Sequence, residues 1–302
     1  MRYINEITKT KYPIIQGGMA NIATGEFAAA CSNAGALGII AAGGMNAERL
    51  EKEIRICKEK TDKPFGVNLM LMSSHIEDLA ELVIKEGVKV LTTGAGSPGI
   101  YMEKWKSAGI TVIPVCASTV LGRRMERCGA DAVIAEGTEA GGHVGEMTTM
   151  TLVPQMTEEV NIPVIAAGGI ASAIQAKAAF ILGACGVQIG TALLASEECP
   201  IHEAYKEKIL KAGDNATIVM GRIAGTPVRS VKNKMAKTYI EMEKKGADKE
   251  ELERFTLGAL RKAVLEGDTE EGSLMAGQVC GQIKEIRPVK DIIEEINEGI
   301  GQ

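Results

Sequence analysis

Pro163-Val-Ile-Ala-Ala-Gly-Gly169 is a short apolar run that ends in two glycines. Near-continuous apolar runs of this kind are typical of strands that are buried on both faces. Consecutive runs of the same type start 21 to 31 residues apart, and helix-like stretches such as 75–86, 101–108 and 120–128 separate them. The other seven runs are residues 13–18, 37–42, 65–70, 88–94, 111–115, 132–137 and 186–191. Strands that alternate with helices indicate a parallel sheet, and eight in succession predict an α/β fold, the (β/α)8 TIM barrel.

The barrel does not use the whole chain. With 302 residues and 45% hydrophobic content the protein can bury a large core, but the fold needs only about 200 to 250 residues. We therefore predict a barrel over residues 1–201 and a smaller cap subdomain, inserted after the eighth strand, over residues 202–271. Residues 272–302 would return to the barrel wall as helices, because isoleucines recur at helical spacing in 289–298.

Composition excludes several classes of protein. A net charge of -5 and 3% aromatic residues argue against nucleic-acid binding. No apolar run approaches 18 residues and the N-terminus has no signal core, so we expect a cytoplasmic protein without membrane contact. The seven cysteines include no CxxC pair, which supports neither a disulfide framework nor a metal site. We interpret Cys116 and Cys185 as core thiols.

Polar and small residues gather where the runs end, and this fold places its chemistry at the carboxyl ends of its strands. Asn68 and Gln188 are polar side chains inside buried runs, and we interpret them as ligand-binding rather than structural amides. Small residues in 16–20 would let a flat ring lie against backbone amides. The polar residues at the run ends are Gln16, Asn68, Thr93, Glu136, His143 and Gln188.

The last two runs end in glycine loops, Gly168-Gly169 and Gly190-Thr191. Loops after strands seven and eight form the usual phosphate site of this fold, and bare backbone N–H groups suit a phosphate dianion. The alternative is that these glycines only permit tight turns. Residues 94–99 also match G-x-G-x-x-G, but Pro98 and the lack of an acid after the next run favour a simple glycine loop.

His143 lies between glycines in the longest gap between runs, whereas His75 and His202 have polar, helix-like surroundings. An imidazole with an ordinary pKa near 6.5 suits proton transfer, so we predict a catalytic role, with a structural histidine as the alternative. Glu136 and Glu139 are close enough in sequence to orient or tune this ring.

These motifs together resemble the flavin-dependent enoyl-acyl-carrier-protein reductase II enzymes, which belong with the nitronate monooxygenase (2-nitropropane dioxygenase) proteins. The matching stretches cover nearly the whole chain, and those at 130–143 and 147–154 are closer to the reductase branch. They include Tyr12-Pro-Ile-Ile-Gln-Gly-Gly-Met-Ala20, Phe65-Gly-Val-Asn-Leu-Met70, Ala135-Glu-Gly-Thr-Glu-Ala-Gly-Gly-His143 and Gly272-Ser-Leu-Met-Ala-Gly-Gln278.

The resemblance implies FMN in the barrel mouth and His143 as the catalytic histidine. NADH or NADPH would reduce the flavin, which would reduce an enoyl thioester carried by acyl carrier protein in fatty-acid synthesis. Stimulation by a monovalent cation and a homodimer are also compatible with it. The cofactor would be held by Gly18, Met19, Ala20, Asn68, Glu136, Gly168, Gly169, Gln188, Gly190 and Thr191.

Two departures and two rival functions stay open. The family often has an aromatic residue where this chain has Asn21, and Arg-Phe where it has Ala192-Leu193. A nitronate monooxygenase would use His143 as a base and molecular oxygen as the acceptor, and a flavin-free binding protein would keep only the phosphate site.

Residues 204–237 hold eight Lys and Arg against two acids, which predicts a docking surface for an acidic carrier protein.

Overall fold

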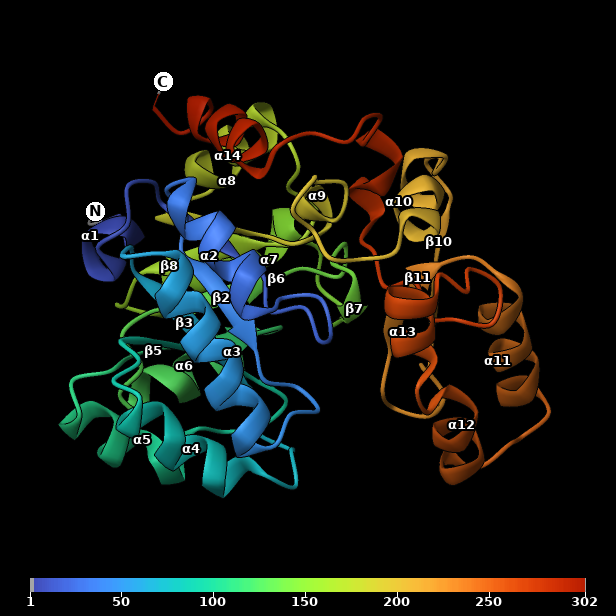
Figure 1. Cartoon of the computed structure of the whole chain (residues 1–302), viewed down its shortest axis with the longest axis horizontal. Helices are drawn as coiled ribbons and strands as arrows, with labels where there is room; N and C mark the ends of the chain where they lie inside the picture. Colours follow the sequence, from blue (N-terminus) through green and yellow to red (C-terminus); the bar gives the residue numbers. More distant parts are fainter. Residues whose placement is uncertain (1–2, 302) are drawn as a thin grey trace.

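A computed structural model describes residues 3–301, and in it the eight predicted runs form one parallel sheet (Figure 1). Neighbouring strands follow the order β1-β9-β8-β6-β5-β4-β3-β2. The two edges meet where Leu37 donates its N–H to the Ile14 carbonyl at 2.8 Å and accepts from the Gln16 N–H at 2.9 Å. The predicted (β/α)8 barrel is therefore confirmed. The strands are β1 (Ile14–Gln16), β2 (Gly38–Ala41), β3 (Phe65–Met70), β4 (Val90–Gly94), β5 (Thr111–Cys116), β6 (Val133–Glu136), β8 (Val164–Ala167) and β9 (Gly186–Ile189).

The inside of the barrel has an apolar layer and, nearer the carboxyl ends of the strands, a polar one. Branched side chains that are at most 2% exposed form the apolar layer: Ile15, Ile39, Val90, Ile113, Ile134 and Ile165. Side chains alternate between the faces of a strand, so the residue two positions further on also points inward. These next inward positions include Asn68, Thr92, Glu136 and Gln188 on four different strands. A packed floor therefore lies beneath a polar opening.

Helices surround the sheet as the sequence predicts. Several begin at a Ser, Thr or Asn whose side chain accepts a backbone N–H of the first turn, as Ser172 does for α8. The predicted C-terminal helix α14 (Val289–Glu298) packs against α8 and α2, where it closes the ring of helices (Figure 1). The other surrounding helices are α2 (Gly25–Asn33), α3 (Ala47–Lys60), α4 (Ile76–Lys85), α5 (Gly99–Ser107), α6 (Thr119–Arg127), α7 (Thr149–Glu159) and α8 (Ala173–Ile181).

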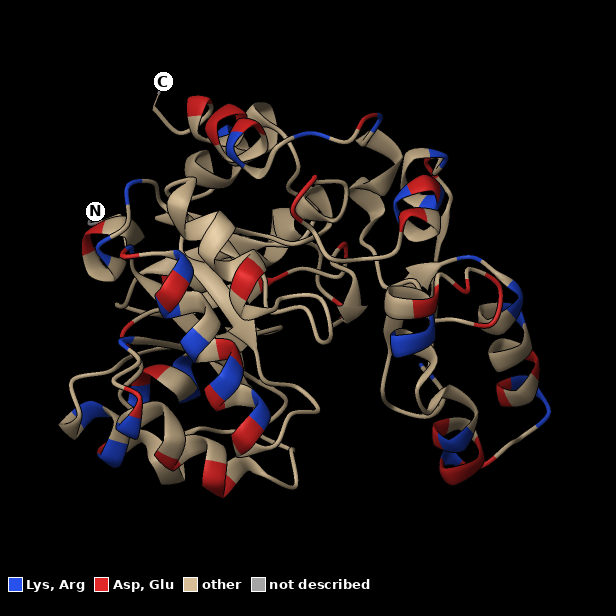
Figure 2. Ribbon diagram, viewed as in Figure 1, with Lys and Arg blue, Asp and Glu red and all other residues tan. Residues whose placement is uncertain are grey.

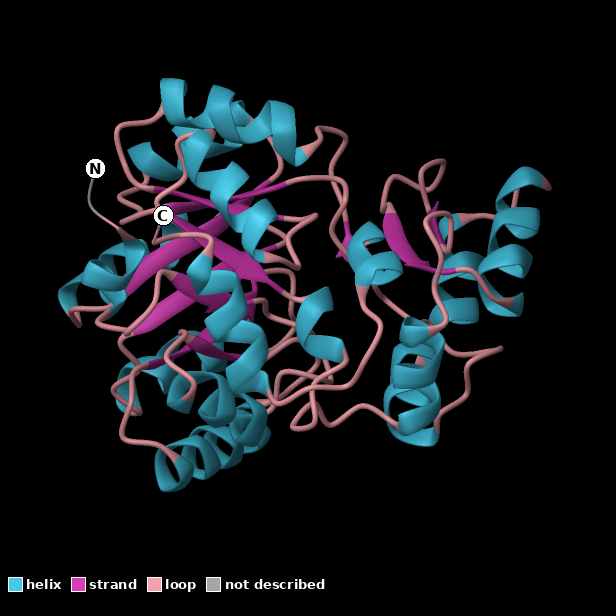
Figure 3. Ribbon diagram, turned by 90° about the horizontal axis from the view of Figure 1, so that it is seen from above, coloured by secondary structure: helices cyan, strands magenta, loops and turns pink. Residues whose placement is uncertain are grey.

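Most of the cap segment, residues 202–271, stands beside the barrel, as the view from above shows (Figure 3). It has its own small core of Met220, Met235, Ala236, Tyr239, Leu252 and Ala259. Helix α10 (Glu203–Leu210) differs, because Tyr205 and Ile209 are buried in the cluster that it shares with the barrel. The predicted domain boundaries stay predictions. The remaining elements of the cap are β10 (Thr217–Met220), β11 (Val228–Val231), α11 (Lys234–Lys244), α12 (Lys249–Thr256), α13 (Ala259–Arg261) and a π-helical turn (Lys262–Glu266).

The cysteines agree with the sequence analysis. All seven are free thiols, and Cys116 and Cys185 are fully buried. Burial raises the pKa of both thiols to about 12, as expected for inert core residues. Among residues 3–301 no helix combines the length and the apolar character needed to cross a membrane.

Candidate functional site

The polar layer at the barrel mouth contains side chains without protein partners. Asn68 donates from Nδ2 to Thr92 Oγ1 at 2.9 Å, which leaves its own oxygen as an acceptor. Gln188 is only 7% exposed, yet within residues 3–301 neither it nor Glu136 makes a side-chain hydrogen bond or an ion pair. Buried polar groups in proteins are nearly always hydrogen-bonded. This opening therefore suits a polar ligand that would supply the missing partners.

Glu136 has an unusual protonation equilibrium. Part of its side chain faces the opening, but the surrounding strand ends remove water from the carboxylate. This desolvation raises the pKa of Glu136 to about 7. Near neutral pH the group can therefore be a hydrogen-bond donor or an acceptor.

The loop after β1 packs closely against two distant strands. A Cβ atom on Gly18 would lie 2.6 Å from the Asn68 side-chain carbon Cγ, so the main chain at Gly18 lies directly against that amide. A Cβ on Gly190 would lie 3.6 Å from Met19 Sδ. The structure thus brings Gly18, Met19, Asn68 and Gly190 together, although they come from three separate parts of the sequence.

The Gly168-Gly169 loop follows β8, the neighbour of β9 in the sheet. Its φ angles are +88° and +74°, in the left-handed region that favours glycine. A Cβ on Gly168 would lie 2.8 Å from the Gly137 carbonyl, so the tight turn also needs close backbone approach. Successive bare N–H groups in such a turn form an anion-binding concavity. The glycines can therefore both permit the tight turn and offer a phosphate site.

Thr191 connects the loop after β9 to the C-terminal segment. Its Oγ1 accepts the Gly277 N–H at 2.9 Å, so the hydroxyl hydrogen is still available for a ligand. Ala192 and Leu193 are buried beside it. This chain has Ala192 where the family often has Arg, and a bound phosphate would have backbone N–H groups and this hydroxyl as donors.

His143 lies on a strand rather than in a free glycine loop. It forms β7 (Gly142–His143), the edge of a three-stranded antiparallel sheet whose other members, β10 and β11, belong to the cap. The side chain is exposed, but neighbouring protein still desolvates the ring enough to lower the pKa of His143 from its ordinary value. The short length of β7 explains why the sequence analysis missed it.

The sequence analysis expected Glu136 and Glu139 to orient or tune His143, but in the structure Glu139 has another partner. Both Glu139 carboxylate oxygens accept the Thr149 N–H, at 3.0 and 2.9 Å, so this group is held at the start of α7. Neither Glu139 nor Glu136 hydrogen-bonds the imidazole within the described residues. The loop is instead packed under the C-terminal segment, where the Gln278 N–H donates to the Glu139 carbonyl at 2.9 Å.

Two of the polar residues named from the sequence face away from the barrel interior. Thr93 follows Thr92 on β4 and therefore points to the opposite face, where its hydroxyl is buried without a partner. Gln16 is fully buried and its Oε1 accepts the Ile39 N–H at 3.1 Å. Thr92, which the sequence analysis missed, is the inward residue. Because side chains alternate along a strand, the apolar Val90 two positions earlier could have identified Thr92 as the inward residue.

The basic stretch at residues 204–237 is largely neutralised. Lys206, Lys208, Lys211, Arg222 and Lys234 each pair with a glutamate. Acidic and basic residues consequently alternate over the cap (Figure 2). Of the eight cations, three have no acidic partner in the described chain, namely the buried Arg229 and the lysines Lys232 and Lys237.

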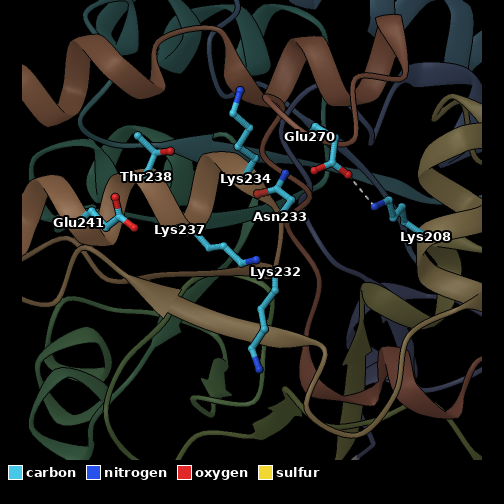
Figure 4. Close-up of a pocket in the computed structure, with 8 residues that line it drawn as sticks. All are labelled: Lys208, Lys232, Asn233, Lys234, Lys237, Thr238, Glu241 and Glu270. Carbon is cyan, nitrogen blue, oxygen red and sulfur yellow. Dashed lines mark hydrogen bonds and ion pairs between the residues drawn. The ribbon is translucent and has the colours of Figure 1, made fainter.

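These two lysines share a cavity of about 400 Å³ on the cap with Lys208 and Lys234 (Figure 4). In it Lys208 donates to Glu270 at 2.9 Å and Lys234 pairs with Glu271, so two of the four charges are already neutralised. The cavity is therefore a smaller basic site than the sequence predicts.

Comparison with known proteins agrees with this architecture. A family model described as nitronate monooxygenase matches residues 2–299. The solved structure of FabK from Thermotoga maritima superposes with a TM-score of 0.96 at 48% identity, and the match covers 100% of this chain and 96% of that one.

Two curated relatives are similar over nearly their full length. A probable nitronate monooxygenase from Staphylococcus saprophyticus is 32% identical over 98% of this chain and 97% of its own. A 5-hydroxy-7a-methyl-1-oxo-octahydro-1H-indene-4-carboxyl-CoA dehydrogenase from Mycobacterium tuberculosis is 31% identical over 97% of this chain and 94% of its own. The chain belongs to the nitronate monooxygenase family.

Proposed function

We propose that this protein is an FMN-dependent reductase that uses NADH or NADPH to reduce enoyl thioesters. The observation that carries the proposal is the barrel mouth, where unpartnered Gln188 and Glu136 side chains adjoin the glycine loops. Full-length similarity at 48% identity to FabK supports the reductase branch, which the sequence resembles. The carboxyl-CoA named for the M. tuberculosis relative is itself a thioester.

The residues at the mouth fit the parts of FMN. Gly168, Gly169, Gly190 and Thr191 would bind the phosphate through backbone N–H groups and one hydroxyl. Gly18, Met19 and Ala20 would lie against the ring system, and Asn68, Gln188 and Glu136 would hydrogen-bond its polar edge. When bound, FMN supplies the two-electron chemistry that couples nicotinamide oxidation to reduction of the substrate double bond.

His143 would supply the proton. Addition of hydride to the β-carbon of an enoyl thioester leaves an enolate, which must be protonated at the α-carbon. A positioned acid contributes roughly 10²- to 10⁴-fold to such a step. Because the pKa of His143 is lowered, its imidazolium is a stronger acid than an ordinary one, and its population grows as the pH falls.

A carrier-bound substrate is the natural extension of this proposal. An acidic carrier protein would meet the cap at Lys232 and Lys237, the two lysines of the basic stretch that no glutamate neutralises. Cytoplasmic location, a homodimer and monovalent-cation stimulation stay predictions.

The second candidate is a nitronate monooxygenase, which the family model and the S. saprophyticus relative favour. His143 would then act as a base toward a nitroalkane, with molecular oxygen as the acceptor. A flavin-free binding protein is the third reading, and a yellow protein with an oxidised-flavin absorption band would exclude it.

An anaerobic turnover assay with crotonyl thioester and NADH or NADPH tests the proposal directly. We expect nicotinamide oxidation that depends on the thioester. Turnover of nitroalkane with oxygen, together with no thioester reduction, would instead establish the monooxygenase.

A further inference from the structure

The cap determines the position of the strand that carries His143. In the antiparallel ladder between β7 and β11, His143 pairs with Val228 and Gly142 pairs with Arg229. One residue later the Val144 N–H donates to the Pro227 carbonyl at 3.1 Å. The main chain on both sides of the histidine is therefore held by β11, not by a barrel strand.

Arg229 connects this ladder to the barrel. Its side chain is 7% exposed, its Nε donates to the Thr138 carbonyl at 3.0 Å and its Nη1 donates to Thr217 Oγ1 at 3.0 Å. Thr138 lies two residues beyond the end of β6, and Thr217 is the first residue of β10. One rigid guanidinium thus joins a barrel loop to a cap strand. It does so at the residue pair of the ladder that adjoins the His143 pair.

The acceptors of Arg229 are both neutral. It forms no ion pair with any of residues 3–301, and burial lowers its pKa from the ordinary range. The nearby Glu139 carboxylate is already held by Thr149. Burying a charge without a counter-ion costs free energy, and apolar side chains of similar volume often stabilise a core as well or better. An apolar side chain could not replace the two hydrogen bonds that this arginine makes to Thr138 and Thr217.

We propose that Arg229 is a positioning residue, which sets the spacing between the barrel loop at Thr138 and the cap hairpin and thereby places the His143 imidazole. The inference rests on the proposed proton transfer by His143. It assigns the cap a role in the chemistry, in addition to any role in substrate binding.

Charged residues also lie on the elements next to the histidine. Glu139 and Glu146 lie on its own loop, Arg222 and Arg229 on the cap hairpin, and Glu136 at the end of β6. The packed C-terminal stretch at 272–278 contains no charged residue. Arg222 pairs with Glu146 at an exposed position, where an ion pair contributes little. Arg222→Gln is therefore a matched control that removes one guanidinium from the same hairpin.

The test measures the His143 titration by NMR in flavin-loaded protein with ¹⁵N-labelled histidine. The chain has three histidines, so the His143 signals are identified by their loss in His143→Gln. In Arg229→Gln we expect the pKa of His143 to rise toward 6.5, because a loosened strand lets water reach the ring. Arg222→Gln should leave it within a few tenths of wild type.

Stopped-flow kinetics give the second readout. Substrate reduction should slow roughly 10- to 100-fold in Arg229→Gln, since a displacement of about 1 Å can cost that much. Flavin reduction by nicotinamide should stay within about twofold. Thr217→Val removes one acceptor of Arg229 with little change in shape. It should shift both readouts in the same direction as Arg229→Gln, but by a smaller amount. This second variant keeps the test valid if Arg229→Gln does not fold.

An unchanged His143 titration and an unchanged substrate half-reaction in Arg229→Gln or Thr217→Val would overturn the proposal, even if the melting temperature falls. Failure of this proposal can be distinguished from failure of the proposed function. If His143→Gln reduces the thioester at the wild-type rate, proton transfer by His143 is wrong, whereas the NMR titration still reports whether Arg229 positions the ring.

Discussion

Thr191 and Gly277 are hydrogen-bonded, with the Gly277 N–H donating to Thr191 Oγ1 at 2.9 Å across 86 residues of sequence. A Cβ on Gly277 would also lie 3.2 Å from the Gly141 N. The C-terminal segment thus contacts both the loop after β9 and the loop that carries His143. The C-terminal segment therefore supports both the candidate phosphate site and the candidate proton-transfer site.

Thr191→Val should weaken FMN binding about tenfold, because it removes the hydrogen bond that Thr191 is proposed to donate to the phosphate, worth about 1 to 1.5 kcal/mol. Loss of the Gly277 contact should lower the melting temperature as well. Equilibrium titration of apo protein with FMN, followed by quenching of flavin fluorescence, measures the affinity. Thr191→Ser keeps the hydroxyl and should bind like wild type. Wild-type affinity in the valine variant would place the phosphate elsewhere.

Gly169→Asp should yield colourless protein, because it places a carboxylate where a phosphate is proposed to bind. The substitution also strains the backbone, since φ is +74°. Gly246→Asp is the matched control, because its φ is +84° and a Cβ there would meet nothing within 4 Å. Absorption at the flavin band after purification is the measurement. Full flavin content in Gly169→Asp would show that the phosphate assignment is wrong.

His143→Gln should slow reduction of the thioester roughly 10²- to 10⁴-fold while leaving flavin reduction by nicotinamide nearly intact. His75→Gln, at an exposed position before α4, should change neither half-reaction. The two half-reactions are separated by anaerobic stopped-flow absorbance. Equal losses in both would indicate a structural histidine.

The pH dependence follows from the lowered pKa of His143. The acid form is populated only below that pKa, so wild-type substrate reduction should speed up as the pH falls and level off below the pKa. The midpoint should lie below 6.5. The same shift means that the unfolded protein binds this proton more readily, and His143 therefore reduces stability as the pH falls through this range.

Glu136→Gln should stabilise apo protein at high pH. The pKa of Glu136 is raised from 4.5 to about 7, so the folded state holds its proton more tightly, and stability is lost as the pH rises through about 7. The cost of ionising it is about 3 kcal/mol at pH 8 and nearly absent at pH 4.5. Urea unfolding of both proteins at the two pH values measures this difference.

Glu103→Gln, on the exposed face of α5, should show no such pH-dependent gain and serves as the control. If Glu136→Gln is equally stable relative to wild type at both pH values, the carboxyl is not desolvated as the structure indicates.

Reversal of Lys232 and Lys237 to Glu should raise KM for a carrier-bound substrate and leave a small thioester unchanged. Long-range attraction steers charged partners and weakens with salt, as the Debye length falls to about 3 Å at 1 M. Reversal of Lys85 and Lys104, on α4 and α5 far from the cap, changes the net charge equally and should have little effect (Figure 1). A similar response of both substrates to salt and to the first reversal would contradict docking at the cap.

Much of the barrel could be predicted because its strands are buried on both faces. Continuous apolar runs such as Val164–Ala167 then occur in sequence, and the polar residues that interrupt them mark the opening. The Gly168-Gly169 loop was recognisable for a related reason, since only glycine adopts its positive φ angles without strain. Both signals are local, so a single sequence contains them.

Other features depend on partners that are distant in sequence. Thr92 rather than Thr93 points into the barrel because strand register decides the facing. Arg222 is neutralised by Glu146, 76 residues away, which composition does not reveal. The two-residue strand at His143 exists because β11 provides its hydrogen-bond partners. Local backbone and burial preferences can be read from the sequence, whereas side-chain facing, charge pairing and the support of His143 arise from contacts between segments that are distant in sequence.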